Sequence, residues 1–377
     1  MQVISDKATV VLAAGGTGGH LFPAQGTCEQ LIADSYVPVL VHDQRATRFI
    51  SGVLSGVDKY EVRSLNMSGS KLQRLLLMPI YLLQTLYNTL LVIFILKNCK
   101  AALVIAFGGY TAVPTILAAL VSGIPCILHE QNAVVGRVNR YFAYFVKAIA
   151  TPLPNEHMDP KFVQKFKNKL HYIGNPVRDK VSAQFYASKM KSRSKFKILV
   201  IGGSQGAQIF SSVMPEAISE LPIDTQRIVH ITQQVRQGTA EATIASYSQT
   251  ASTFEVASYF DNIGELYAAH DIVISRAGAS TIAELCTFGC PAILVPYPFA
   301  TDDHQYYNAL YLSKYNCSVL INQRDFTPQR VADEILKMIL TPDYLDKMRE
   351  GFDGIEKIDT TQKLRLLVES IMKPEVK

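Results

Sequence analysis

Short apolar runs alternate with longer helical stretches along this chain. Strand-like apolar runs lie at residues 9–14, 38–41, 102–107, 125–128, 197–201, 227–231, 271–275 and 292–296. Stretches with helical periodicity lie between them, at 24–33, 72–96, 111–121, 281–287 and 329–339. Strands that alternate with helices are typical of parallel sheets, so the pattern predicts an α/β fold.

A glycine-rich turn occurs twice, at nearly half-chain spacing. TVVLAAGGTGGHLFPA (9–24) and KILVIGGSQGAQIFSS (197–212) each predict a strand, a glycine loop and a helix. Gly15 and Gly202 are 187 positions apart (202 − 15) in a chain of 377 residues. This echo favours two Rossmann-like halves over one large sheet. The basic, aperiodic stretch 171–194 predicts the linker, so we expect domains at 1–177 and 178–354.

The most apolar segment, 75–96, has 22 residues without a charge and is long enough to span a membrane. Amides and hydroxyls at helical spacing nevertheless make one face polar: Gln84, Thr85, Asn88 and Thr89. A span would also separate two strands that belong to one sheet. We therefore expect a crossover helix whose leading part, 71–81, lies in the membrane interface. An ordinary buried helix is the alternative.

Composition narrows the classes of partner. Apolar residues make up 48% and charged residues 18%. This composition suits a large core and is compatible with binding to a lipid surface. A net charge of +5 is too weak to indicate nucleic acid. The charge is local, because residues 161–197 hold eleven Lys/Arg and one acid (+10), leaving −5 elsewhere (5 − 10). Such a stretch suits anionic lipid or a diphosphate, with a solvated linker as the default. Six cysteines without C-x-x-C spacing indicate reduced thiols of a cytosolic protein.

The two glycine loops favour a phosphate-bearing ligand. Backbone N–H groups at a helix N-terminus, with the positive end of its dipole, bind anions. Neither loop carries the dehydrogenase fingerprint or a P-loop lysine, and turn packing alone is the alternative. His20 closes the first loop at the carboxyl end of a strand, where ligands bind in open α/β sheets. Its ring suits a general base, while a surface or capping histidine is the alternative.

Polar clusters follow other predicted strands. The run His129–Asn132 follows the strand at 125–128, with a loop hydrogen-bond network as the alternative to a ligand site. Gly108–Tyr110 adds a third loop at this edge. Gln305 and Asn308 carry amides that suit sugar hydroxyls. The neighbouring pair 302–303 suggests a metal site, but adjacent carboxylates in an extended loop point apart, so we expect no metal.

A helix opens after the strand at 271–275. Backbone N–H groups of Ala279 to Thr281 would face a diphosphate, and Glu284, one turn on, would accept two ribose hydroxyls. Thr281 and Glu284 also fit a capping box, which is the structural alternative.

Together these motifs resemble the MurG family of GT-B glycosyltransferases, over nearly the whole chain. The residues that carry the resemblance are GGTGGHLFPA (15–24), GGY (108–110), HEQNAVVGRVNR (129–140), GNPVR (174–178), GGSQGA (202–207), SRAGASTIAEL (275–285) and HQYYNA (304–309). Each motif is weak alone, but the ordered set is specific. The resemblance implies two Rossmann-like parallel-sheet domains that face a central cleft. It also implies a C-terminal helix, about 355–377, that packs back on the first domain.

By this resemblance the second domain binds UDP-N-acetylglucosamine. The implied donor ligands are Arg178, Ser204, Phe260, Ala279, Ser280, Thr281, Ile282, Ala283, Glu284 and Gln305. Ser204 contacts a phosphate, Glu284 the ribose and Gln305 the sugar. Phe260 stands where many relatives have isoleucine. A backbone contact to uracil would survive that change, but the resemblance does not predict how the phenylalanine ring packs around uracil. In the first domain Thr17, Gly18, Gly19 and Asn132 close on the donor sugar or hold the acceptor, and His20 is the implied catalytic base.

The implied reaction is a single inverting displacement. The C4 hydroxyl of undecaprenyl-diphospho-N-acetylmuramyl-pentapeptide (lipid I) attacks the donor's anomeric carbon, which gives lipid II of peptidoglycan. No cofactor or metal is implied. The expected partners are UDP-N-acetylglucosamine, lipid I, the cytoplasmic membrane surface and other cell-wall or division proteins, but no nucleic acid. We expect a peripheral protein on the cytoplasmic face of the inner membrane.

Three alternatives remain at the level of sequence. Another GT-B enzyme would use a different lipid acceptor or epimerise UDP-N-acetylglucosamine. A nucleotide-dependent oxidoreductase would use Asp43, after the second strand, as its ribose ligand. A membrane-bound scaffold would have no catalytic role, which the polar loops at the strand ends disfavour.

Overall fold

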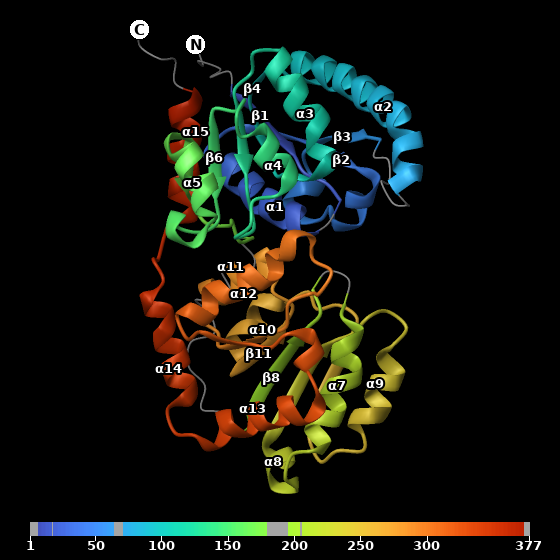
Figure 1. The fold of residues 1–377 in the computed structure, drawn as a ribbon, viewed down its shortest axis with the longest axis vertical. Coiled ribbons are helices and arrows are strands. Elements are labelled where there is room, and N and C mark those ends of the chain that lie inside the picture. The colour runs from blue at the N-terminus through green and yellow to red at the C-terminus, as the bar shows by residue number, and fades with distance from the viewer. Residues whose placement is uncertain (1–6, 17, 64–70, 179–194, 204–205, 373–377) are drawn as a thin grey trace, which may run out of the picture. The chain divides into compact units, whose positions relative to one another are not determined.

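The computed structural model of the chain describes residues 7–16, 18–63, 71–178, 195–203 and 206–372, with the backbone alone at 71–75. It divides into two compact units (Figure 1). Unit 1 comprises Met1–Arg178 and Ile358–Lys377, and unit 2 comprises Asp179–Lys357. The later part of the expected linker, 179–194, lies outside the described residues.

Unit 1 is built on a parallel seven-stranded sheet with the order β3-β2-β1-β4-β5-β6-β7. The strands are β1 (Thr9–Ala13), β2 (Val37–Asp43), β3 (Asp58–Val62), β4 (Ala101–Ala106), β5 (Cys126–His129), β6 (Ala148–Thr151) and β7 (Leu170–Tyr172). Leu12 pairs with Leu40 on one side and with Ile105 on the other, and all three are fully buried. Central strands with both faces covered read as continuous apolar runs, which is why the sequence pattern revealed them.

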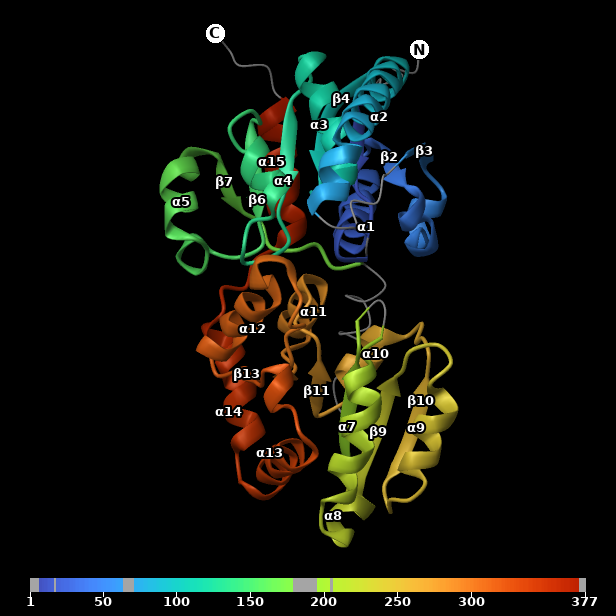
Figure 2. The same cartoon turned by 45° about the vertical axis from the view of Figure 1, so that its right-hand side comes forward.

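The helices of unit 1 form a layer on each face of this sheet (Figure 2). They are α1 (Gly18–Ala33), α2 (Lys71–Asn98), α3 (Gly109–Val121), α4 (Arg137–Phe142), α5 (Pro160–Phe166) and α15 (Thr360–Met372). Right-handed crossovers place α2 to α5 on one face, where α2 packs on α3 and α3 on α4. The opposite face carries α1 and α15, which pack on each other.

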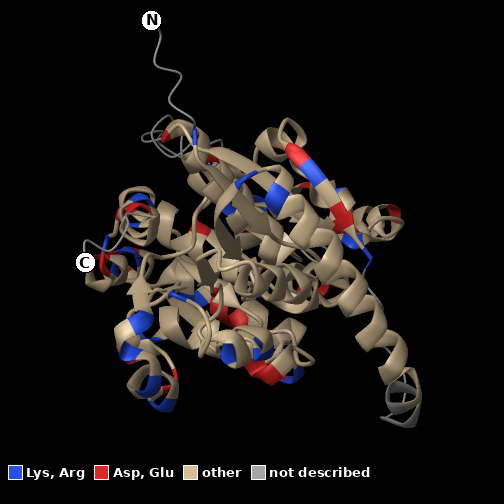
Figure 3. Cartoon of the chain, turned by 90° about the horizontal axis from the view of Figure 1, so that it is seen from above, with Lys and Arg blue, Asp and Glu red and all other residues tan. Residues whose placement is uncertain are grey.

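Helix α2 is amphipathic in the reverse sense to a helix of a soluble core around Asn88 and Thr89, whereas nearer its end the inward residues Val92, Ile95 and Leu96 are apolar and buried. Its polar stripe faces inward: Asn88 and Thr89 are 3% and 8% exposed, and Asn88 Nδ2 donates to the carbonyl oxygen of Arg63 at 2.7 Å. The opposite stripe is exposed and apolar, with Leu76, Leu82, Leu83, Leu86, Tyr87, Leu90 and Phe94 each more than half exposed. Leu76–Asn98 is long and apolar enough to cross a membrane, although length and composition alone do not establish a span. The ordinary buried helix is therefore wrong, and the expected polar positions lie on the face that packs on the domain. Figure 3 shows that most of the length of α2 carries no charged residue.

The last helix, α15, belongs to unit 1 although it follows the whole of unit 2. Its Leu364, Leu367 and Val368 are buried in the same apolar cluster as Leu31 of α1. An ion pair between Arg365 and Asp34, at 3.7 Å, lies at the rim of this contact. The core of unit 1 thus consists of two segments that are far apart in the sequence.

Unit 2 is built on a parallel six-stranded sheet with the order β10-β9-β8-β11-β12-β13. The strands are β8 (Phe196–Ile201), β9 (Val229–Gln234), β10 (Thr253–Ala257), β11 (Ile272–Ser275), β12 (Ala292–Leu294) and β13 (Ser318–Leu320). The helices are α7 (Gln208–Ser219), α8 (Ile223–Ile228), α9 (Ala240–Tyr247), α10 (Ile263–Ala269), α11 (Ala279–Phe288), α12 (His304–Lys314), α13 (Pro328–Leu340) and α14 (Tyr344–Gly351). The predicted α/β class with two parallel sheets is confirmed.

Candidate functional site

The first glycine loop presents His20 in the first turn of α1. The His20 Nδ1 atom lies 2.9 Å from the carbonyl oxygen of Gly15. Because a carbonyl only accepts, Nδ1 carries the proton in this contact, so in the neutral ring the lone pair is on Nε2. The loop at Gly109 lies against the ring: a Cβ atom there would be 3.0 Å from His20 Cε1, and its φ of +72° is a left-handed value. Two loops from neighbouring strands therefore fix the position and the tautomer of His20.

Asp43, at the carboxyl end of β2, is hydrogen-bonded to both of these loop regions. Its buried carboxylate accepts from the backbone N–H groups of Gly16 and Ala46, at 3.0 and 3.1 Å. It also accepts two bonds from Arg45 and one from the Thr111 hydroxyl of α3. Burial raises the pKa of Asp43, but these donors outweigh it and hold the pKa below its ordinary value. The carboxylate is thus committed to the protein itself, which disfavours its proposed role as a ribose ligand in an oxidoreductase.

The run His129–Asn132 forms a buried hydrogen-bond network, which was the structural alternative. The Glu130 carboxylate accepts from the backbone N–H groups of Gln131, Asn132 and Gly136, each at 2.9 Å, and from Asn139 Nδ2. His129 does not pair with it; its ring stacks on Phe107, and burial lowers its pKa to about 3. Asn132, half-buried at the surface of this network, is therefore the member best placed to meet a ligand.

In unit 2, the residues after β11 begin helix α11. The N-cap of this helix is Gly278, which has no side chain that could cap it. Thr281 therefore lies inside the first turn, and the expected capping box of Thr281 and Glu284 is wrong. The Glu284 carboxylate instead accepts a hydrogen bond from the Tyr267 hydroxyl at 2.8 Å. Both side chains are buried, and Tyr267 stacks on Phe288 within 5.4 Å. Helix α11 therefore begins with uncapped N–H groups and carries a carboxylate whose orientation is set by a tyrosine.

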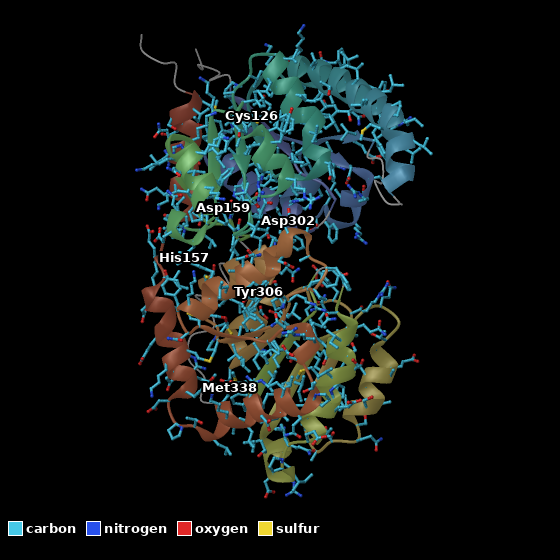
Figure 4. The ribbon with its side chains drawn as sticks, in the orientation of Figure 1. Cys126, His157, Asp159, Asp302, Tyr306 and Met338 are labelled. Carbon is cyan, nitrogen blue, oxygen red and sulfur yellow. The ribbon has the colours of Figure 1, made fainter. Side chains whose placement is uncertain are left out.

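Gln305 lies in the first turn of α12, after a turn with unusual backbone geometry. The backbone N–H of Tyr297 donates to Gln305 Oε1 at 3.0 Å, which turns the amide NH₂ group away from Tyr297. Asp302 and Asp303 both have a φ of +52°, so both residues of the turn that precedes α12 have left-handed backbone conformations. Figure 4 labels Asp302 in this turn. Asn308 is buried and donates to the carbonyl oxygen of Ala277 at 3.1 Å, which ties α12 to the loop before α11.

Arg276, which lies in the loop between β11 and α11, has no role in the sequence-based prediction. Its guanidinium donates to the carbonyl oxygens of Val295 and Pro296, and to Gln323 Oε1. It also lies between the rings of Phe210 and Tyr297, 5.4 and 5.5 Å from their centroids. One side chain thus joins the loops after β11, β12 and β13. Its position in the motif SRAGAS could have marked it as a candidate residue. Its partners could not be predicted, because they are up to 47 residues away in the sequence.

The remaining predicted residues lie at the carboxyl ends of strands or outside the described part. Gly18 and Gly19 open α1, and Phe260, half-buried, follows β10. Arg178 places its guanidinium 4.5 Å from the Phe22 ring centroid in unit 1. Thr17 and Ser204 lie outside the described residues. Over the described ranges, no group of three or more His, Cys, Asp or Glu side chains is arranged to hold a metal ion.

Two family models together match most of the chain. The glycosyltransferase family 28 N-terminal domain matches residues 10–151, and the glycosyltransferase family 28 C-terminal domain matches residues 197–364. The first match contains His20 and Asn132, and the second contains Glu284 and Gln305.

Curated relatives match over nearly their full lengths. A Zymomonas mobilis protein is 38% identical, covering 96% of this chain and 92% of its own; a Bradyrhizobium protein is 39% identical, covering 97% and 98%. Both are named UDP-N-acetylglucosamine--N-acetylmuramyl-(pentapeptide) pyrophosphoryl-undecaprenol N-acetylglucosamine transferase. Among solved structures, Acinetobacter baumannii MurG matches at a TM-score of 0.74 and 25% identity, over 96% of this chain and 99% of that one.

Proposed function

Since the chain belongs to the MurG family of glycosyltransferases, we propose that it transfers N-acetylglucosamine from UDP-N-acetylglucosamine to the C4 hydroxyl of lipid I. The product is lipid II, the precursor of peptidoglycan. The observation that carries this proposal is the 38–39% identity, over nearly full length, to relatives named for that reaction.

We assign donor binding to unit 2. The N–H groups of Ala279 to Thr281 at the start of α11 suit the diphosphate, because a helix N-terminus favours negative charge, and Ile282 and Ala283 continue the same turn. Glu284 would accept the ribose hydroxyls, with Tyr267 holding its second oxygen. The Gln305 NH₂ group, oriented by Tyr297, would donate to a sugar hydroxyl. Ser204, Phe260 and Arg178 complete the proposed set at the phosphate, the uracil and the leaving group.

We assign the acceptor and the base to unit 1. The His20 Nε2 lone pair would take the proton of the attacking C4 hydroxyl, and the Nδ1–H bond to Gly15 keeps that tautomer. Thr17, Gly18, Gly19 and Asn132 would position the reacting sugars. Negative charge that develops on departing UDP would be stabilised by the α11 N-terminus and by Arg178.

The lipid tail of the acceptor stays in a bilayer, so the enzyme must reach that surface. The exposed apolar stripe of α2 is the feature of unit 1 that suits this task, since its polar stripe is already buried. We therefore propose peripheral association with the cytoplasmic face of the inner membrane.

The decisive experiment is an assay of the purified chain with UDP-N-acetylglucosamine and a lipid I analogue, with and without a chelator. We expect a product heavier than the acceptor by one N-acetylglucosamine residue, at equal rates in both conditions. Conversion of the donor alone would identify an epimerase. Binding of NADH without binding of UDP would identify an oxidoreductase.

A further inference from the structure

A cluster of aromatic rings stands exposed at the end of α4. Tyr141, Tyr144 and Phe145 are 65%, 53% and 57% exposed. They rest on two buried rings: Tyr141 packs edge-on against Phe142 at 5.1 Å, and Tyr144 packs against Phe166 at 4.9 Å. The exposed rings are therefore held rigidly at the surface, and large exposed apolar groups of this kind mark contact surfaces.

Lysines of α5 and of the turn after it surround these rings. Lys165 Nζ lies 4.6 Å from the Tyr144 ring centroid, and Lys169 Nζ donates to the carbonyl oxygens of Ala143 and Tyr144. Lys161 and Lys167 are also exposed. Residues 137–169 hold seven Lys/Arg and two acids, a net charge of +5 (7 − 2). The first part of the basic stretch recognised in the sequence thus lies on a folded surface, beside exposed aromatic rings.

This aromatic and lysine surface lies in the same helical layer as α2. Helices α2, α3 and α4 pack side by side on one face of the sheet, and α5 joins α4 through Tyr144 and Phe166 (Figures 1 and 2). The apolar stripe of α2 and the rings of α4 are therefore two exposed surfaces of one layer, separated by α3.

We propose that Tyr141, Tyr144 and Phe145, with Lys161, Lys165 and Lys167, form a second contact with an anionic lipid bilayer, separate from α2. Tyrosine and phenylalanine rings lie at the headgroup level of bilayers, and lysines beside them attract anionic lipids. Aromatic rings are also common in protein interfaces, but lysines are depleted there, so it is the lysines beside these rings that favour a lipid surface. Two contacts in one layer hold that layer against the membrane, whereas one contact leaves the unit free to pivot. This inference rests on the membrane association proposed above.

The test measures binding of the purified full-length chain to vesicles of phosphatidylcholine, with and without phosphatidylglycerol. The variant Y141S/F145S removes two rings, and K161Q/K165Q/K167Q removes three charges. The matched charge control, K314Q/K347Q/K357Q, changes exposed lysines of unit 2. The α2 variant L83S/L86S is the comparison for the proposed association itself.

We expect both surface variants to bind phosphatidylglycerol vesicles about tenfold more weakly or worse. The lysine variant should match the wild type on phosphatidylcholine alone, and the unit 2 control should match it on both. Every variant should unfold at the same temperature as the wild type. If Y141S/F145S unfolds at a lower temperature, the single variant F145S replaces it in the binding test. Wild-type binding by both surface variants would overturn the inference. If the wild type itself does not bind the vesicles, the proposed membrane association is wrong; if L83S/L86S binds like a wild type that does bind, α2 is not the contact.

Discussion

The Tyr267 hydroxyl donates a hydrogen bond to Glu284 Oε2 at 2.8 Å, from a residue 17 positions earlier in the chain. Both side chains are buried, so the carboxylate that we assign to ribose cannot rotate freely. If Glu284 binds the ribose as proposed, Tyr267 is a positioning residue for donor binding.

Removal of this hydroxyl should weaken donor binding more than turnover. In Y267F we expect KM for UDP-N-acetylglucosamine to rise roughly three- to tenfold, for the loss of about 1 kcal/mol, with kcat within about twofold of the wild type. Y247F is the matched control, because the buried Tyr247 donates to Gln233 within the same unit. It should lower thermal stability and leave KM unchanged. Equal KM values in wild type and Y267F would contradict the proposed role of Glu284.

The proposed base is tested by H20A. We expect kcat with a lipid I analogue to fall by about 10²- to 10⁴-fold, because proton transfer by a positioned side chain is worth that much. Binding of UDP, measured by calorimetry, should be unaffected, because we assign the donor to unit 2. Turnover near that of the wild type would show that His20 is not the base.

A methyl group at Gly109 should disturb His20. In G109A the new Cβ would lie 3.0 Å from His20 Cε1 at a left-handed φ, so we expect kcat to fall at least about tenfold and stability to fall by about 1 kcal/mol. G123A has a similar φ of +68° with nothing within 4 Å, so it isolates the backbone cost. Comparable kcat losses in both variants would show that contact with His20 is not the cause.

The reversed polarity of α2 predicts reversed effects of substitution. We expect N88L to lower the free energy of unfolding by about 1–3 kcal/mol, because the carbonyl of Arg63 loses its donor and a buried polar site must accept leucine. L90N, at a side chain 58% exposed, should change it by less than about 0.5 kcal/mol. Urea denaturation of both variants measures the difference. A larger loss in L90N would contradict the inward orientation of the polar stripe.

His129 should make stability fall on acidification. Burial lowers its folded-state pKa to about 3, whereas an unfolded histidine titrates near 6.5. Between these values the unfolded chain binds a proton that the folded chain does not. This contribution is therefore full above about pH 6.5 and falls by up to about 1.4 kcal/mol per pH unit below it. In H129N, urea denaturation between about pH 7 and 4 should show a shallower decline than in the wild type. Parallel curves would refute this assignment.

Most central strands and the glycine loops could be read from the sequence, because buried parallel strands are continuous apolar runs. The central strand β6 was missed although it is fully buried, because its four residues, two of them alanine, make too short and too weak an apolar run. The edge strand β3 could not, since four of its five residues are exposed and polar or aromatic. The start of β9 was predicted at Arg227 but is Val229, because α8 extends to Ile228. Periodicity identified the polar stripe of α2 but not which stripe faces the domain, since that depends on Arg63 and α3.

The candidate site also has a part that the sequence predicted and a part that it did not. Its motifs lie at strand ends, which local sequence reveals. The partners that orient them do not: Asp43 and Thr111 are 68 residues apart, and Arg276 and Gln323 are 47 apart. Such pairs are fixed by sheet order, which no single segment encodes.

Helix α15 has a consequence for the order in which the chain is built. During translation, residues 1–178 leave the ribosome first, and all of unit 2 follows before α15 appears. Until then the apolar surface of α1 that later covers Leu364, Leu367 and Val368 stays open. Unit 1 can therefore complete its core only after all of unit 2 has been synthesised, so its first 178 residues emerge as an unfinished domain.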